Sequence, residues 1–97
     1  MASKMILELA VEPEKLDEFV ETVKGALPDT RAFDGCRHLE FWTAADGSGR
    51  VLLHEVWETK AHQEKYMAWR AETGFLEVLG PFLTGEPKVT WLDEHEF

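Results

Sequence analysis

Apolar residues recur with two different periods along this chain, and the order of these periods limits the fold most strongly. Residues 4–11 place apolar side chains at every second position, which predicts a strand with one buried face. Residues 13–27 place them at helical spacing along one stripe, which predicts an amphipathic helix. We expect this helix to begin near Pro13 and to end before Pro28.

The strand pattern then occurs twice in succession. Residues 36–43 and 51–58 are both rich in apolar and aromatic side chains. The intervening residues 44–50 contain the turn-forming pair Asp46-Gly47. This arrangement predicts a β-hairpin with a longer loop.

A second helix and a last strand follow the hairpin. Thr59 is a suitable N-cap, and we expect the helix to continue to about Glu72 and to be interrupted at Gly74. Residues 75–83 predict a short apolar turn of helix packed under the sheet, and residues 88–92 predict a strand.

The order is therefore β-α-β-β-α-β, which is typical of a ferredoxin-like α+β fold with a four-stranded antiparallel sheet and both helices on one face. At 97 residues the chain is large enough for one core and too short for two. We assign residues 1–97 to a single domain.

The face of the sheet opposite the helices is predicted to be unusually apolar. Ile6, Ala10 and Trp42 should lie on it, together with either Val56 or Trp57. A soluble monomer rarely exposes such a patch. We therefore expect a homodimer in which a second copy covers this face by a two-fold sheet-to-sheet contact.

Charge and composition exclude several classes of partner. Nineteen acidic and ten basic residues give a formal net charge of -9, which disfavours nucleic acid and anionic membrane surfaces. No apolar run has the roughly 20 residues that a spanning helix needs. The single cysteine, Cys36, excludes an intrachain disulfide. We expect a soluble, cytoplasmic protein.

Four segments cover nearly the whole chain and carry a family resemblance. They are ILELAVEPEKLDEFV at 6–20, TRAFDGCRHLEF at 30–41, LLHEVWETKAH at 52–62 and YMAWRAETGFLEVLGPFL at 66–83. In order and spacing, the chain resembles the antibiotic biosynthesis monooxygenase family of dimeric α+β barrel proteins. The resemblance implies a homodimer with a substrate pocket between sheet and helices in each subunit.

The resemblance also implies an activity. Monooxygenases of this family use O2 to convert phenolic or quinol-type aromatic substrates to quinones without metal or flavin, so we expect no cofactor. The scaffold also hosts isomerases, haem degraders and proteins without catalysis. Tyr66 stands where many relatives carry a helix His, and the sequence has no Asn, which disfavours haem chemistry.

Six residues are the candidates for the site. His54, Tyr66 and His38 are predicted catalytic residues, and either histidine could act as a base because an imidazole titrates near neutral pH. Tyr66 could also form a flat wall for an aromatic ligand. Trp57, Trp69 and Arg70 are predicted to bind substrate, through flat aromatic walls and a cation for a phenolate or carboxylate.

Structural alternatives stay open for all six. The aromatic residues are suited to the core, the histidines to structural hydrogen bonds, and Arg70 to a surface ion pair with Glu72 or with a partner residue. Among the strand carboxylates, one that faces the helices would be a functional candidate, because its burial is costly; these are Glu8, Glu40 and Glu55.

The sequence predicts no metal site. The pair His38-x-Glu40 supplies only two ligands, and the run at 94–96 lies in a terminal tail. Two functions are therefore carried forward. The first is a cofactor-independent monooxygenase that oxidises a phenol, anthrone or quinol, and the second is a non-catalytic small-molecule-binding or stress-response protein.

Overall fold

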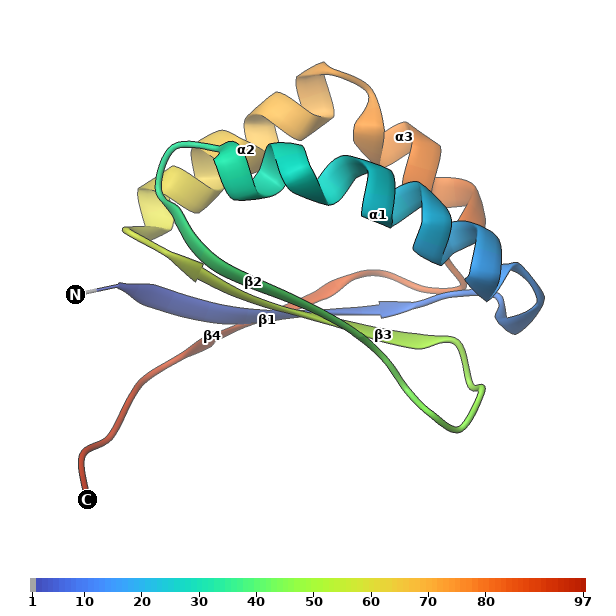
Figure 1. The fold of residues 1–97 in the computed structure, drawn as a ribbon, viewed down its shortest axis with the longest axis horizontal. Helices are drawn as coiled ribbons and strands as arrows, with labels where there is room; N and C mark the ends of the chain where they lie inside the picture. Colours follow the sequence, from blue (N-terminus) through green and yellow to red (C-terminus); the bar gives the residue numbers. More distant parts are fainter. Residues whose placement is uncertain (1) are drawn as a thin grey trace.

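The fold consists of one antiparallel sheet with helices on one of its faces (Figure 1). The computed structural model describes residues 2–97. Its elements are β1 (Ser3–Ala10), α1 (Leu16–Ala32), β2 (Cys36–Thr43), β3 (Arg50–Trp57), α2 (Lys60–Glu72), α3 (Phe75–Leu79) and β4 (Lys88–Leu92), with 3-10 turns at Pro13–Lys15 and Gly80–Phe82. The strands are ordered β2-β3-β1-β4. The predicted β-α-β-β-α-β order is confirmed, with α3 as a short addition before β4.

The predicted end of the first helix was wrong. Helix α1 continues through Pro28 to Ala32, although a proline lacks the N–H that the carbonyl of Lys24 would accept from. The last turn is fixed by contacts from α2, because Thr30 is buried and hydrogen-bonded there and the Ala26 carbonyl accepts a hydrogen bond from Arg70 at 2.9 Å. These tertiary bonds offset the cost of the proline.

The helix-covered face holds the core, as the alternation predicted. Along β3, every second residue is buried, from Val51 through Leu53 and Glu55 to Trp57. Phe19 of α1 is also fully buried against this face. Because Trp57 points into the core with 0% exposure, Val56 is the residue that faces the other way.

The opposite face is not covered by any element of residues 2–97 (Figure 1). The strand registers place Glu40, His54, Ile6 and Thr90 in one row across it. We call this surface the open face. Trp42, on the edge strand β2, is 58% exposed there.

Helices α1 and α2 have 17 and 13 residues, and both carry charged side chains. Within residues 2–97, none is long and apolar enough to cross a membrane.

Candidate functional site

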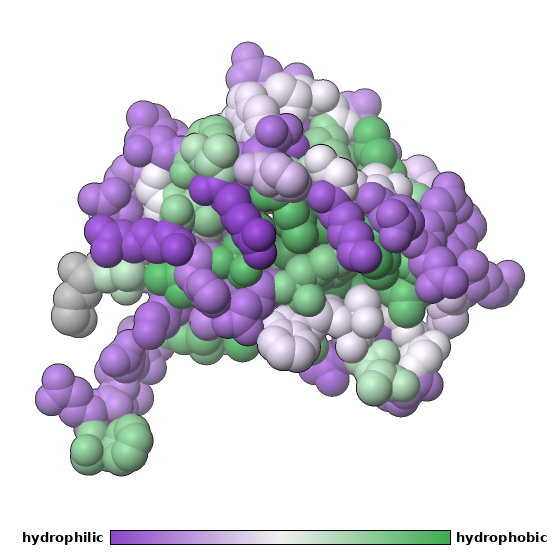
Figure 2. All heavy atoms as spheres, viewed as in Figure 1, coloured by the Kyte–Doolittle hydropathy of each residue, from purple (hydrophilic) through white to green (hydrophobic). Residues whose placement is uncertain are grey.

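A cavity of about 300 Å³ lies between the sheet and the helices. Its wall is almost entirely apolar and includes Leu7, Leu9, Leu27, Leu53, Met67 and Leu79. Figure 2 shows apolar side chains exposed between the helix layer and the sheet layer, bordered by polar ones. A volume of this size falls in the range of small-molecule sites.

One side of the cavity carries a connected polar group, which we call the Arg70 network. The guanidinium of Arg70 donates from Nε to the Tyr66 hydroxyl at 2.8 Å and from Nη2 to Thr30 Oγ1 at 2.9 Å. The hydroxyls of Thr30 and Tyr66 are themselves 2.7 Å apart. All three residues line the cavity. Helices α1 and α2 are thus joined by hydrogen bonds at the cavity wall.

Arg70 is a buried cation without an anionic partner. The residue is 6% exposed, and no carboxylate of residues 2–97 lies within ion-pair distance of its guanidinium. The predicted surface ion pair with Glu72 is therefore wrong. The guanidinium carbon instead lies 4.4 Å from the Phe75 ring centroid and 4.6 Å from that of Trp69.

The guanidinium also keeps donors for a ligand. Of its five N–H groups, the ones on Nε and Nη2 make the bonds to Tyr66, Thr30 and Ala26. Nη1 finds no acceptor among residues 2–97. A fixed, positively charged donor at an apolar wall favours an anionic oxygen on the ligand.

Glu55 supplies the carboxylate of the site. It lines the cavity from β3, is 5% exposed, and accepts a hydrogen bond from Trp57 Nε1 at 2.8 Å. Burial raises the pKa of Glu55, and the bond from Trp57 opposes that shift only in part. Glu55 can therefore hold a proton closer to neutral pH than an exposed glutamate does.

Tyr66 and Arg70 are the predicted residues that the cavity brings together. Trp57 and Trp69 lie behind them and outside the lining. The Trp57 ring is 5.2 Å from that of Tyr66, and Trp69 is 6.2 Å from it. The two tryptophans hold the Tyr66 ring in place, and their predicted contact with substrate remains a prediction.

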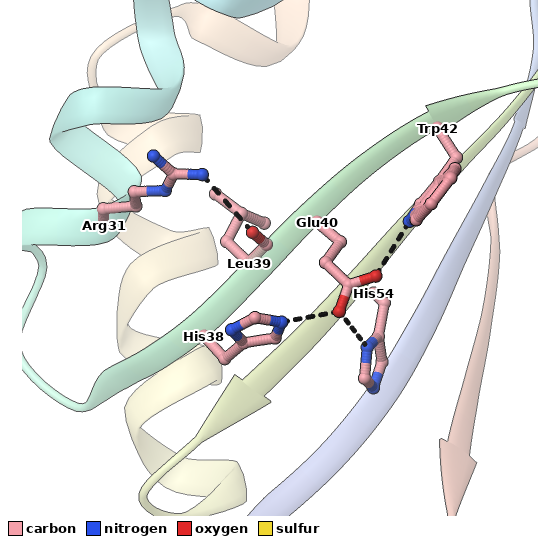
Figure 3. A network of polar contacts seen from close by, with 6 residues as sticks. All are labelled: Arg31, His38, Leu39, Glu40, Trp42 and His54. Atoms are coloured by element: carbon pink, nitrogen blue, oxygen red, sulfur yellow. Dashed lines mark hydrogen bonds and ion pairs between the residues drawn. The ribbon is translucent and has the colours of Figure 1, made fainter.

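The two predicted histidines lie on the other side of the sheet. His38 and His54 are on the open face, where both contact the Glu40 carboxylate (Figure 3). The sheet separates them from the Arg70 network. Their predicted catalytic role remains a prediction, and it would place chemistry on the open face and not in the cavity.

Sequence reasoning assigned no role to Thr30 or Gln63, which are buried at the cavity. Glu55 was a candidate only if it faced the helices. Its register settles that question, because Glu55 is paired with Met5 on β1 and Leu39 on β2, both of them core residues. Alternation with Leu53 and Trp57 was the signal in the sequence.

Solved structures share this fold over nearly the full chain. A conserved protein from Methanosarcina mazei Go1 matches with a TM-score of 0.85 at 17% identity, covering 98% of this chain and 94% of that one. An antibiotic biosynthesis monooxygenase matches with a TM-score of 0.86 at 18% identity, covering 99% and 100%. Rv0793 from Mycobacterium tuberculosis matches with a TM-score of 0.83 at 21% identity, covering 100% and 98%. These likenesses show the ferredoxin-like fold.

The family is established by sequence. No curated protein matches the chain. The family model for antibiotic biosynthesis monooxygenases matches residues 3–79, which include β1 to β3, α1 and α2 with the Arg70 network and Glu55. The chain belongs to the antibiotic biosynthesis monooxygenase family.

Proposed function

We propose that this protein is a cofactor-independent monooxygenase that oxidises a phenolic, anthrone or quinol-type aromatic substrate with O2. The observation that carries the proposal is the apolar cavity with Arg70 in its wall, a buried cation that no carboxylate neutralises. A flat aromatic anion combines the two properties that this cavity accepts, an apolar body and one charged oxygen.

The first step is removal of a proton from the substrate. Glu55 is the base in this proposal, because its raised pKa brings it closer to the pKa of an acidic phenol or anthrone C–H. The Nη1 donors of Arg70, with the Tyr66 hydroxyl, stabilise the oxygen on which the negative charge then develops. The apolar walls exclude water from that anion.

The oxidation needs only the substrate anion and O2. The anion transfers an electron to O2, and the resulting radical pair combines to a carbon-bound peroxide anion. Glu55 returns its proton to this anion, and loss of water from the hydroperoxide leaves a carbonyl. For an anthrone CH2 group, one O2 is consumed, one oxygen atom enters the product and the other leaves as water. The protein supplies a base, an anion site and a dry cavity.

We also propose that the protein works as a homodimer in the cytoplasm. The open face supports the dimer, because Ile6, Leu52, Val56 and Leu92 lie on it at diagonal positions between polar neighbours, and no element of residues 2–97 covers them. A second copy of the sheet would bury these apolar side chains by two-fold contact.

A second function has its own supporting observation. The Arg70 network is held together by hydrogen bonds among Thr30, Tyr66 and Arg70. Such a network can also serve as a rigid wall of a binding pocket that has no catalytic role. The alternative is a protein that binds an aromatic small molecule without turnover.

Oxygen uptake separates the two functions. The proposal expects O2 consumption above the spontaneous rate with at least one substrate from a panel of anthrones, naphthols and hydroquinones. Uptake at the spontaneous rate across the panel, with saturable quenching of tryptophan fluorescence by the same compounds, would favour the binding protein. Neither uptake nor quenching would contradict both.

A further inference from the structure

We propose that His38, Glu40 and His54 form a binding site for one divalent transition-metal ion of the zinc class on the open face of the sheet. The three side chains each offer one ligand atom, and these atoms all lie within 4.8 Å of one another. The site lies on the face opposite the cavity and is independent of the oxygenase chemistry. Because the second copy of the proposed homodimer would cover this face, the ion would lie at the contact between the two subunits.

The strand register brings the three ligands together. His38 and Glu40 are two residues apart on β2, so their side chains point to the same face of the sheet. His54 lies directly opposite Glu40 on β3. Two neighbouring strands thus fix all three positions, and the backbone under the site is a regular ladder from His38 onward.

The distances fit a shared ion after small side-chain rotations. Glu40 Oε2 is 2.6 Å from His38 Nε2 and 3.5 Å from His54 Nδ1 (Figure 3). Ligands on one Zn²⁺ ion bind at about 2.0–2.2 Å, so neighbouring ligand atoms stand roughly 3–4 Å apart. An ion would sit between the imidazoles and replace the hydrogen bond from His38 to Glu40.

Trp42 orients the carboxylate for this role. Its Nε1 donates to Glu40 Oε1 at 3.0 Å (Figure 3), which leaves Oε2 directed at both histidines. Outer hydrogen bonds of this kind commonly position metal ligands. The indole is otherwise 58% exposed, and this bond accounts for its placement.

The ligand set selects the class of ion. Two imidazoles and one carboxylate suit zinc and the neighbouring transition metals, whereas calcium and magnesium prefer all-oxygen sites. Three protein ligands leave coordination positions for water. The formal net charge of -9 favours cations at the surface in general.

The test is calorimetric titration of the whole, chelator-treated protein with Zn²⁺. We expect one ion per chain, and at least about tenfold weaker binding in each of H38Q, E40Q and H54Q, since loss of even an outer partner costs roughly tenfold. The matched control is H95Q, which removes a histidine from the terminal acidic run and should bind as wild type does.

Two further measurements sharpen the result. Co²⁺ in place of Zn²⁺ should give the visible absorption of a four- or five-coordinate ion, lost in H54Q and kept in H95Q. Trp42→Phe should weaken Zn²⁺ binding by up to about tenfold, and wild-type affinity in that variant would overturn the role assigned to Trp42. Circular dichroism checks that each variant is folded.

Absence of Zn²⁺ binding would overturn the proposal, as would binding that H95Q abolishes while H38Q and H54Q retain it. Oxygen uptake by the chelator-treated protein is scored separately, so failure of the metal site and failure of the oxygenase proposal remain distinguishable.

Discussion

Arg70 Nε lies 2.8 Å from the hydroxyl oxygen of Tyr66, one helical turn earlier on α2. This bond aligns the guanidinium along the cavity wall while Nη2 crosses to α1. The same residue therefore joins two helices and presents a positive charge to the cavity. Both consequences can be measured.

Replacing Arg70 by methionine should destabilise the protein and abolish oxygen uptake. Three hydrogen bonds are lost, each donated by the charged guanidinium and worth roughly 1.5–3 kcal/mol. Removal of the buried charge offsets part of this loss. We therefore expect the free energy of unfolding, measured by urea denaturation, to fall by about 3 kcal/mol. Arg37→Met is the control, because Arg37 is exposed and its one ion pair, with Glu58, is long at 3.8 Å. This variant should change the free energy of unfolding by less than about 1 kcal/mol. Equal losses in both variants would contradict the role of the Arg70 network.

Tyr66→Phe separates the hydroxyl from the ring. The ring contacts with Trp57 and Phe33 remain, while Arg70 and Thr30 each lose one hydrogen-bond partner. We expect a loss of about 1–2 kcal/mol in the free energy of unfolding, with a larger fractional loss of oxygen uptake than of substrate affinity. Unchanged uptake would remove the hydroxyl from the proposed anion site.

Glu55→Gln should stabilise the protein in a pH-dependent way. Burial raises the pKa of Glu55 in the folded state, so the folded protein binds more protons than the unfolded chain between the two pKa values. Its stability then falls as pH rises from the ordinary glutamate pKa of about 4.3 through the raised value. Glutamine keeps an acceptor for Trp57 and carries no charge.

The expected gain in melting temperature for Glu55→Gln is therefore absent near pH 4 and present at pH 7. Glu64→Gln, at an exposed position of α2, controls for the loss of one negative charge in an acidic protein. A gain of the same size at both pH values, or an equal gain in the control, would argue against a buried ionised carboxylate. Oxygen uptake should fall in Glu55→Gln if this residue is the base.

Two glycines of the hairpin region differ in a way that can be tested. Gly47 and Gly49 both have positive φ angles, of 75° and 84°. A Cβ on Gly49 would collide with the Val11 carbonyl oxygen, whereas one on Gly47 would meet nothing within 4 Å. Gly47→Ala should cost about 1–2 kcal/mol for the left-handed backbone alone. Gly49→Ala should lower the stability clearly more, as measured by thermal denaturation. Equal losses in the two variants would show that the loop backbone moves to make room for the added methyl group.

The sequence predicts the element order well because one face of each strand is buried. Alternation in β1 and β2 places their core residues correctly. For β3 the alternation left open whether Trp57 or Val56 faces the helices, and the structure places Trp57 there. Helix α1 was predicted too short because local propensity penalises Pro28. The compensating bonds come from Arg70, more than 40 residues away, and no local pattern contains them.

The cavity was only partly predictable. The sequence identified Tyr66 as a candidate because it is an aromatic residue on one side of the second helix, and Arg70 because it offers a cation to a phenolate or carboxylate. It did not reveal Thr30, whose contact depends on how α1 crosses α2. The cluster of His38, Glu40 and His54 required the register between β2 and β3, which the hydrophobic pattern alone does not fix to a single residue.

The most direct test of the central claim uses ¹⁸O2 with the anthrone or naphthol that supports the fastest uptake, because these substrates must gain an oxygen atom to form a quinone. The account predicts that wild-type protein forms a product with one ¹⁸O atom per turnover, and that Arg70→Met forms it no faster than the protein-free reaction while Arg37→Met resembles wild type. Product oxygen that comes from water, or equal ¹⁸O incorporation by wild type and Arg70→Met, would contradict it.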